Sequence, residues 1–301
     1  MNNVLITGST GFIGKKLANA IESDNIAIKV VSRAKHPKFE TYINDISDCK
    51  FPQNLMVGID TVFHLAGVTH DYKKNKDEFY KVNVKATEKL CILASKSKVK
   101  KFIFVSSVKA AGSAKKGSCL NEKYQGIPDG YYGKSKRQAE IKLLNIAKKY
   151  DLNVSIIRPA LVYGPNLKGN LDLMMKGIKQ GWFPPLPDID NSRSMVHVDD
   201  VVRALLFVAN TDKTNGEIYN ITDGVAHSSR EIYEVMCSLN DKSIPKWSVP
   251  KVVFKSLALL SPRLKYRLEK LLGDDLYCSK KIESLGFKIE RTIRDMNETI
   301  F

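Results

Sequence analysis

Apolar and polar residues follow two different rhythms along the first half of the chain. Short apolar runs of strand length recur, and longer segments with an apolar residue every three or four positions separate them. Strands are predicted at residues 3–7, 28–32, 61–65, 101–106 and 154–158, and helices at residues 12–23, 77–97 and 133–150. This alternation predicts right-handed β-α-β units and therefore an α/β fold with a doubly wound parallel sheet.

The rhythm changes after Pro159, where prolines and glycines mark loops and short helices. A helix at 199–210 and a strand at 217–222 are predicted to return to the first domain, whereas the tail from 228 to 301 is mostly helical and basic. We therefore expect a first domain of residues 1–165 plus about 195–224. A smaller, mostly helical C-terminal domain takes about 166–194 plus 225–301, and we expect it to hold the substrate.

The first predicted strand runs directly into the glycine-spaced turn Gly8-Ser9-Thr10-Gly11-Phe12-Ile13-Gly14, and a helical pattern opens at Phe12. Glycines allow a tight reversal and let the backbone approach an anion without a Cβ, while the helix N-terminus offers free N–H donors. This arrangement predicts a pyrophosphate cradle and hence a dinucleotide-binding Rossmann domain.

Composition narrows the class of protein. Of the 301 residues 43% are hydrophobic and 27% are charged, as in a globular enzyme, and no apolar run has the roughly 18–20 residues that span a bilayer. Residues 1–3 lead straight into the first strand, so we expect no signal peptide and a cytoplasmic location. Five scattered cysteines without metal-like spacing predict reduced thiols and no metal site.

The net charge of +16 allows nucleic-acid binding, anionic-membrane binding or a lysine-rich solvated surface. The lysines are spread along the chain, which favours the solvated surface, with a basic funnel for an anionic small substrate. The segment 248–272 combines apolar residues with cations and could lie on an anionic membrane. We favour the simpler interpretation, in which its apolar faces are packed within the second domain, and expect neither membrane association nor nucleic-acid binding.

A candidate catalytic group follows the fourth predicted strand. Ser106-Ser107 ends that strand, and Tyr132 and Lys136 lie four residues apart on the next helix, so that they share a face. An ammonium group beside a phenol stabilises the phenolate, which lets a tyrosine exchange a proton with an alcohol or ketone near neutral pH. A serine hydroxyl can hold the same oxygen.

Together these residues resemble an extended short-chain dehydrogenase/reductase of the sugar-nucleotide epimerase/dehydratase group. Five further motifs of that group occur in the right order: Asn44-Asp45-Ile46, His64-Leu65-Ala66-Gly67, Asn83-Val84, the run from Arg158 to Pro165, and Arg193-Ser194-Met195-Val196-His197-Val198-Asp199-Asp200.

The resemblance implies a role for each matching position. Tyr132 is the proton donor or acceptor, Lys136 tunes it and binds the nicotinamide ribose, and Ser107 holds the reacting oxygen. The implied cofactor-binding residues are Gly8, Thr10, Gly11, Phe12, Ile13, Gly14, Ser32, Arg33, Asp45, Ile46, Leu65, Ala66, Gly67, Asn83, Lys136 and Pro159. The implied substrate-binding residues are Ser107, Lys109, Tyr132, Asn170 and Arg193. Arg193 also suits a phosphate group because guanidinium binds phosphate through a bidentate fork. A homodimer is expected by analogy.

Cofactor choice depends on the end of the second strand, where a carboxylate would hold the adenosine ribose. Ser32 and Arg33 stand there instead, leaving room for a 2′-phosphate and a cation to bind it. The sequence therefore favours NADP(H), and NAD stays open.

The reaction is narrowed by the residues after Ser107. Dehydratases of the group place an acid there, but this chain has Val108-Lys109, which argues against elimination. We expect hydride transfer at C4 of a UDP-sugar, with reduction of a UDP-4-keto-6-deoxy-N-acetylhexosamine for surface polysaccharide favoured. UDP-hexose or UDP-N-acetylhexosamine 4-epimerisation with tightly bound NAD is the alternative. A non-catalytic NADP(H)-sensing module is a third possibility, which the intact triad disfavours.

Overall fold

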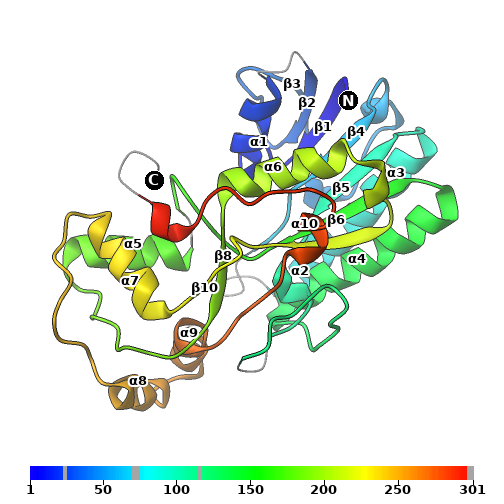
Figure 1. Cartoon of the computed structure of the whole chain (residues 1–301). Coiled ribbons are helices and arrows are strands. Elements are labelled where there is room, and N and C mark those ends of the chain that lie inside the picture. The colour runs from blue at the N-terminus through cyan, green and yellow to red at the C-terminus, as the bar shows by residue number, and fades with distance from the viewer. Residues whose placement is uncertain (23–25, 70–74, 114–116, 168, 297–301) are drawn as a thin grey trace.

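Seven parallel strands form the central sheet in the computed structural model, which describes residues 1–22, 26–69, 75–113, 117–167 and 169–296 (Figure 1). Their order is β3-β2-β1-β4-β5-β6-β9. The strands are β1 (Asn3–Thr7), β2 (Ala27–Ser32), β3 (Glu40–Ile43), β4 (Thr61–His64), β5 (Lys101–Val105), β6 (Asn153–Pro159) and β9 (Glu217–Ile221). The doubly wound α/β prediction is confirmed, and β3 is an additional edge strand that the sequence pattern did not reveal.

Helices cover both faces of this sheet (Figure 1). On one face α1 (Phe12–Glu22) packs against α6 (Val198–Ala209), and on the other α3 (Thr87–Lys96) packs against α4 (Gly130–Tyr150). Each pair shares a buried apolar cluster with the strands between them. The single helix predicted at 77–97 is α2 (Lys76–Phe79), a π-helical turn (Tyr80–Ala86) and then α3.

A second, three-stranded sheet and a set of helices form the remainder of the molecule. Their bounds are β7 (Leu161–Tyr163), α5 (Asn170–Gln180), β8 (Arg193–His197), β10 (Ala226–His227), α7 (Ser229–Ser238), α8 (Lys251–Ala258), α9 (Pro262–Leu272) and α10 (Lys280–Glu283). Residues from β7, α5, β8, α7 and α8 share one apolar cluster of their own. In the part of the chain that the structure describes, no helix is both long and apolar enough to span a membrane.

The last described residues of the chain contact both the seven-stranded sheet and the smaller part of the molecule. Tyr277, Ile282 and Phe287 join the apolar cluster of the large sheet, although the sequence analysis grouped this segment with the smaller domain. Further on, Arg291 and Arg294 return to the junction between the domains.

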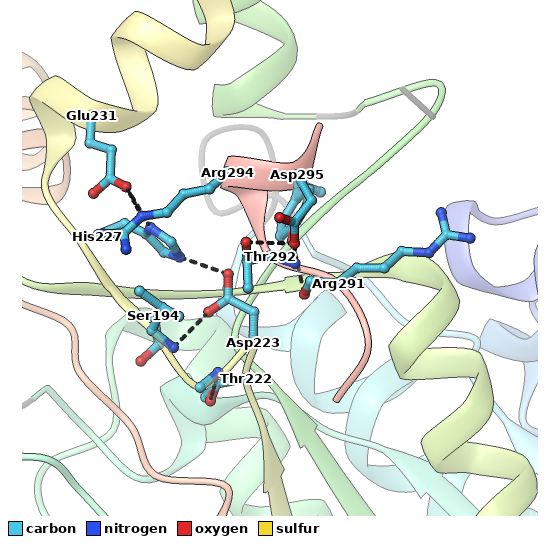
Figure 2. A network of polar contacts seen from close by, with 12 residues as sticks. Ser194, Thr222, Asp223, His227, Glu231, Arg291, Thr292, Arg294 and Asp295 are labelled. Carbon is cyan, nitrogen blue, oxygen red and sulfur yellow. Dashed lines mark hydrogen bonds and ion pairs between the residues drawn. The ribbon is translucent and has the colours of Figure 1, made fainter. Parts of the chain in front are cut away.

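This junction contains a chain of polar contacts (Figure 2). His227 Nε2 lies 2.7 Å from Asp223 Oδ2, and both side chains are fully buried. Glu231 Oε1 lies 3.4 Å from His227 Nδ1 and accepts a 2.5 Å hydrogen bond from Arg294 Nε. Burial lowers the pKa of His227, but the hydrogen bond and charge of Asp223 outweigh burial and raise it overall.

Candidate active site

The glycine-spaced turn follows β1 and is closely packed. Gly8 has φ +76°, and a Cβ on it would lie 2.8 Å from the backbone nitrogen of Ala66. A Cβ on Gly14 would overlap the carbonyl oxygen of Gly8, which also accepts a 2.9 Å hydrogen bond from Gly11 N. Both glycines are therefore required by close backbone approach, as the sequence analysis expected.

His64, at the end of β4, contacts the end of β1, from which the glycine-spaced turn begins. Its Nδ1 lies 2.6 Å from Thr7 Oγ1 and its Nε2 lies 2.7 Å from Thr87 Oγ1. The Thr7 hydroxyl also accepts a 3.2 Å hydrogen bond from Ala66 N. Burial and, to a smaller extent, the charge of Lys136 together lower the pKa of His64 to about 3, so the imidazole is neutral. The sequence analysis matched His64 to a motif and missed this positioning role.

These residues fit the diphosphate of a dinucleotide. The backbone around Gly8 and Gly14 forms a cradle that a Cβ would fill, and α1 begins at Phe12 with no acidic residue in its first turn. The first N–H groups of a helix have no intrahelical acceptor and attract an anion. Thr10 is exposed, and Gly11, Phe12 and Ile13 are half-buried at this helix start.

Lys136 and Tyr132 extend from α4 toward the loop that follows β4. Lys136 is almost fully buried, donates a 2.8 Å hydrogen bond to the carbonyl of Val105, and lies 5.9 Å from the centre of the Tyr132 ring. A Cβ on Gly67 would lie 3.3 Å from Lys136 Nζ, which places the ammonium beside the loop that follows β4. Burial lowers the pKa of Lys136 to about 8, against the opposing effect of Glu140. The structure therefore brings the predicted Tyr–Lys pair to the strand ends.

The two serines after β5 differ in their partners. Ser106 is buried, and its hydroxyl donates a 2.5 Å hydrogen bond to Glu140, which forms a fully buried ion pair with Arg158. Ser107 is half-buried, and its Oγ accepts a 3.3 Å hydrogen bond from Lys109 N. Ser107 is therefore the serine whose hydroxyl can still donate to a bound oxygen.

Lys109 connects Ser107 to the start of α4. Its carbonyl accepts a 3.1 Å hydrogen bond from Asp129 N, and a Cβ on Gly133 would lie 2.5 Å from that carbonyl. Gly133 therefore lets the segment of Ser107 approach the helix of Tyr132. The sequence analysis did not identify this requirement, although Gly133 lies between the predicted residues Tyr132 and Lys136.

Asn83 lies in the π-helical turn and holds the site together. Its Oδ1 accepts a 2.7 Å hydrogen bond from Val68 N, and its Nδ2 donates to Val68 O at 3.0 Å and to Ser135 Oγ at 2.9 Å. All three contacts are with protein, so the structure shows Asn83 positioning the loop after β4 against α4. Its predicted contact with the cofactor stays a prediction.

The ribose end of the expected cofactor site lies at β2 and the loop after β3. Ser32 ends β2, Arg33 is exposed, and Asp45 accepts a 2.8 Å hydrogen bond from Ser47 N. This hydrogen bond lowers the pKa of Asp45, and the charge of Arg33 lowers it further. Ile46 and Tyr132 both pack against the apolar cluster of Val68, Phe79 and Val82, so the loop after β3 and α4 share this cluster. Pro159 ends β6 beside β9.

The predicted substrate residues lie on the other side of the site. The Asp129 carboxylate pairs with Lys109 Nζ at 3.7 Å and with Lys270 of α9. Arg193 Nη1 donates to the carbonyls of Lys270 and Gly273, and therefore holds the C-terminal end of α9. Asn170 is exposed on the first turn of α5. The phosphate contacts expected of Arg193 and Asn170 stay predictions.

Comparison with known proteins identifies the architecture. Residues 4–222 match the model of the NAD dependent epimerase/dehydratase family. The chain belongs to this family. A UDP-glucose 4-epimerase of Vibrio cholerae is 30% identical, over 97% of this chain and 92% of that protein.

Two other matches add detail. A 4-epimerase of N-acetyl-α-D-glucosaminyl-diphospho-ditrans,octacis-undecaprenol from Escherichia coli O157:H7 is 29% identical, over 97% of this chain and 92% of that protein. The crystal structure of a UDP-glucose 4-epimerase from Thermotoga maritima with UDP-glucose has a TM-score of 0.80 at 23% identity, covering 97% of this chain and 95% of that one. The second match shows the fold alone.

Membership of the epimerase/dehydratase family confirms the resemblance inferred from the seven motifs. It also confirms that the protein is an enzyme and that its chemistry is NAD dependent in the broad sense of the family. The reaction itself, and the choice between the two nicotinamide cofactors, depend on the residues of this chain.

Proposed function

We propose that this enzyme reduces C4 of a UDP-4-keto-6-deoxy-N-acetylhexosamine with NADPH, in the cytoplasm and for surface-polysaccharide synthesis. The arrangement of Tyr132 and Lys136 supports this proposal most directly, because the ammonium lies beside the phenol ring and next to the loop that follows β4. The reaction needs a proton donor at that position, and a tyrosine next to a cation supplies one near neutral pH.

Each of these residues has a separate role in the proposed reaction. The nicotinamide, when bound, supplies the hydride that reaches C4. The Tyr132 phenol donates its proton to the C4 oxygen as negative charge develops there, and the Ser107 hydroxyl donates a hydrogen bond to the same oxygen. Lys136 stabilises the resulting phenolate until a proton from solvent replaces the one transferred.

Elimination chemistry is disfavoured by the surroundings of Ser107. The next residue, Val108, is buried, and Lys109 follows it. The nearby carboxylate of Asp129 is held between Lys109 and Lys270. A dehydratase needs a carboxylic acid that can move a proton to or from the substrate, and this carboxylate is already engaged in two ion pairs.

The preference for NADPH is supported by Arg33 and by the absence of a carboxylate at the end of β2. The Arg33 side chain is exposed beside the loop of Asp45, where it can bind a 2′-phosphate. An Arg33→Ala variant should raise the KM for NADPH about tenfold, since one charged hydrogen-bonding pair contributes on the order of 1.5 kcal/mol, and leave the KM for NADH unchanged. Equal effects on both cofactors would remove Arg33 from this role.

A second candidate is 4-epimerisation, which the named activities of the Vibrio cholerae and Escherichia coli relatives favour. The same tyrosine, lysine and serine would then oxidise C4 and reduce it again from the other face. The Escherichia coli relative acts on a polyprenol diphosphate sugar, so the diphosphate of our substrate could end in a nucleoside or a polyprenol.

The two reactions differ in what they consume. Purified protein incubated with UDP-4-keto-6-deoxy-N-acetylglucosamine and NADPH should oxidise one NADPH per ketone reduced. In a parallel incubation, UDP-N-acetylglucosamine without added reductant should remain unchanged. Interconversion of C4 epimers in that second incubation would establish the epimerase instead.

A Tyr132→Phe variant tests the catalytic assignment for either reaction. It removes the phenol proton and should lower kcat at least a hundredfold, while the dissociation constant for the cofactor changes little. Tyr131→Phe is the matched control because Tyr131 is half-exposed on the preceding position of α4. Full activity in Tyr132→Phe would exclude Tyr132 as the proton donor.

A further inference from the structure

The helical hairpin of residues 242–272, which contains α8 and α9, leaves large apolar side chains in solvent. Exposed fractions are 86% for Leu259, 73% for Leu260, and 64% for both Trp247 and Val252, whereas α8 buries only Phe254. The sequence expectation that the apolar faces of the segment are packed is therefore confirmed for Phe254 and for the leucines at the end of α9, and is wrong for these four exposed residues. Figure 1 shows α8 at the outer edge of the smaller domain, away from β3.

The same hairpin is strongly basic. Residues 242–272 contain eight lysines and arginines and a single acid, Glu269, so they carry a net +7 of the chain's +16. Lys251 and Lys255 are exposed and share one face of α8, four residues apart, beside the apolar residues. The charges therefore border the apolar surface.

We propose that this hairpin docks on the surface of an anionic phospholipid bilayer. Exposed apolar patches mark interaction sites, and apolar side chains with tryptophan on one side and lysines on the other are typical of helices that lie in a membrane interface. Lysines attract anionic headgroups while their stems extend along apolar surface. A protein partner is disfavoured because the cores of protein interfaces are depleted in lysine.

Two contacts connect the hairpin to the active site. Lys270, in the last turn of α9, pairs with Asp129, which also binds Lys109. Arg193 donates to the carbonyls of Lys270 and Gly273. Since α9 has 11 residues and rises about 1.5 Å per residue, it is roughly 16 Å long, and Leu260 lies just before its start, at the end opposite to these contacts. A docked hairpin therefore brings the site close to the bilayer, a consequence that rests on the proposed function.

Vesicle sedimentation tests the docking. The full-length protein is mixed with vesicles of phosphatidylglycerol and phosphatidylethanolamine, and in parallel with vesicles of phosphatidylcholine alone. Binding to the anionic vesicles should exceed binding to the neutral ones at least tenfold and should weaken as salt is raised, because the lysine contribution is electrostatic. Equal binding to both compositions, or to neither, would overturn the proposal.

Two variants and two controls localise the surface. Leu259→Ser/Leu260→Ser removes exposed apolar side chains, and Lys251→Glu/Lys255→Glu reverses two charges; each should weaken binding at least tenfold. Val57→Ser changes an equally exposed apolar residue elsewhere, and Lys213→Glu/Lys288→Glu makes the same charge change on other exposed lysines. Both controls should bind vesicles like the unaltered protein, and weakening equal to that of the hairpin variants would contradict the assignment.

Two further measurements distinguish membrane docking from self-association of the chain, and separate its failure from a failure of the proposed function. Light scattering should give the same molar mass for the unaltered protein and Leu259→Ser/Leu260→Ser; a lower mass for the variant would make the patch a contact between copies of the chain and overturn membrane docking. NADPH oxidation with the water-soluble UDP-4-keto sugar should be unchanged in the hairpin variants. Vesicle binding without any such activity would leave the docking surface standing and refute the proposed function.

Discussion

Two fully buried histidines, His64 at the end of β4 and His227 at the end of β10, have pKa values that are shifted in opposite directions. His64 closes the end of β4 between the hydroxyls of Thr7 and Thr87, and burial lowers its pKa to about 3. His227 follows β9 at the domain junction, and the Asp223 carboxylate raises its pKa despite burial. Burial, helped by the charge of Lys136, thus keeps His64 neutral, whereas the carboxylates of Asp223 and Glu231 reverse the effect of burial on His227.

The opposite pKa shifts of His64 and His227 agree with the different roles of the strand ends and the domain junction. The strand ends around His64 hold a site for a dinucleotide, and a neutral imidazole linked to two hydroxyls fixes their spacing at any physiological pH. At the junction, Asp223, Glu231 and Arg294 join β9, α7 and the chain end through charges (Figure 2). The hydrogen bonds of His64 at the nucleotide site are therefore neutral, whereas the contacts of His227 at the junction involve charged partners and are sensitive to pH.

Replacing Asp223 gives the largest expected effect. Asp223→Asn removes the buried negative charge, so the free energy of unfolding should fall by about 3 kcal/mol, as when one partner of a buried pair is lost. The control Asp212→Asn removes a carboxylate that is 97% exposed in its pair with Lys101 and should cost less than about 1 kcal/mol. Chemical denaturation at pH 6 measures both free energies of unfolding. Equal decreases in the two variants would show that the buried Asp223 pair contributes no more stability than an exposed one.

His64 should make the protein less stable in acid. Its pKa rises from about 3 in the folded state to 6.5 when unfolded, so its contribution is complete above pH 6.5 and declines as the pH falls toward 3. Between pH 7 and pH 5 the loss is about 2 kcal/mol. His64→Gln should remove that part of the pH dependence, and His36→Gln, at a half-buried position away from His64, should leave it intact. If the free energy of unfolding changed with pH in the same way for His64→Gln and the unaltered protein, His64 would not be neutral in the folded state.

His227 should give a smaller dependence of opposite sign. Because its folded pKa is raised, its stabilising contribution is present below pH 6.5 and is lost as the pH rises through the folded pKa. The unaltered protein should therefore lose stability relative to His227→Gln as the pH rises above 6.5. A stability difference that grows in the acid direction instead would contradict the charge assigned to this histidine.

The sequence predicted the elements that bury a continuous apolar run and missed those that do not. The strand at residues 3–7 was predicted with its observed bounds, because all but its first residue are buried. Glu40–Ile43, by contrast, forms a short edge strand with no fully buried residue. The helix predicted at 77–97 is interrupted by a π-helical turn that contains Asn83, and such turns are frequent at functional sites.

The candidate site was predictable to the extent that its residues are neighbours in sequence. Tyr132 and Lys136 are one helical turn apart, so their proximity follows from the helix alone. The contacts of His64 join residues 57 and 23 positions away, and the packing of Gly133 against Lys109 depends on a loop. The exposed face of the α8–α9 hairpin was also not predictable, since spacing shows which side chains are apolar but not whether anything covers them.

Deuterium transfer tests the central claim most directly. The protein is incubated with UDP-4-keto-6-deoxy-N-acetylglucosamine and NADPH that carries deuterium on the transferred position of the nicotinamide, and the product is examined by NMR and mass spectrometry. Our account predicts one deuterium per product molecule, bonded to C4, and none with Tyr132→Phe. Unreduced ketone, or product without deuterium at C4, would contradict it.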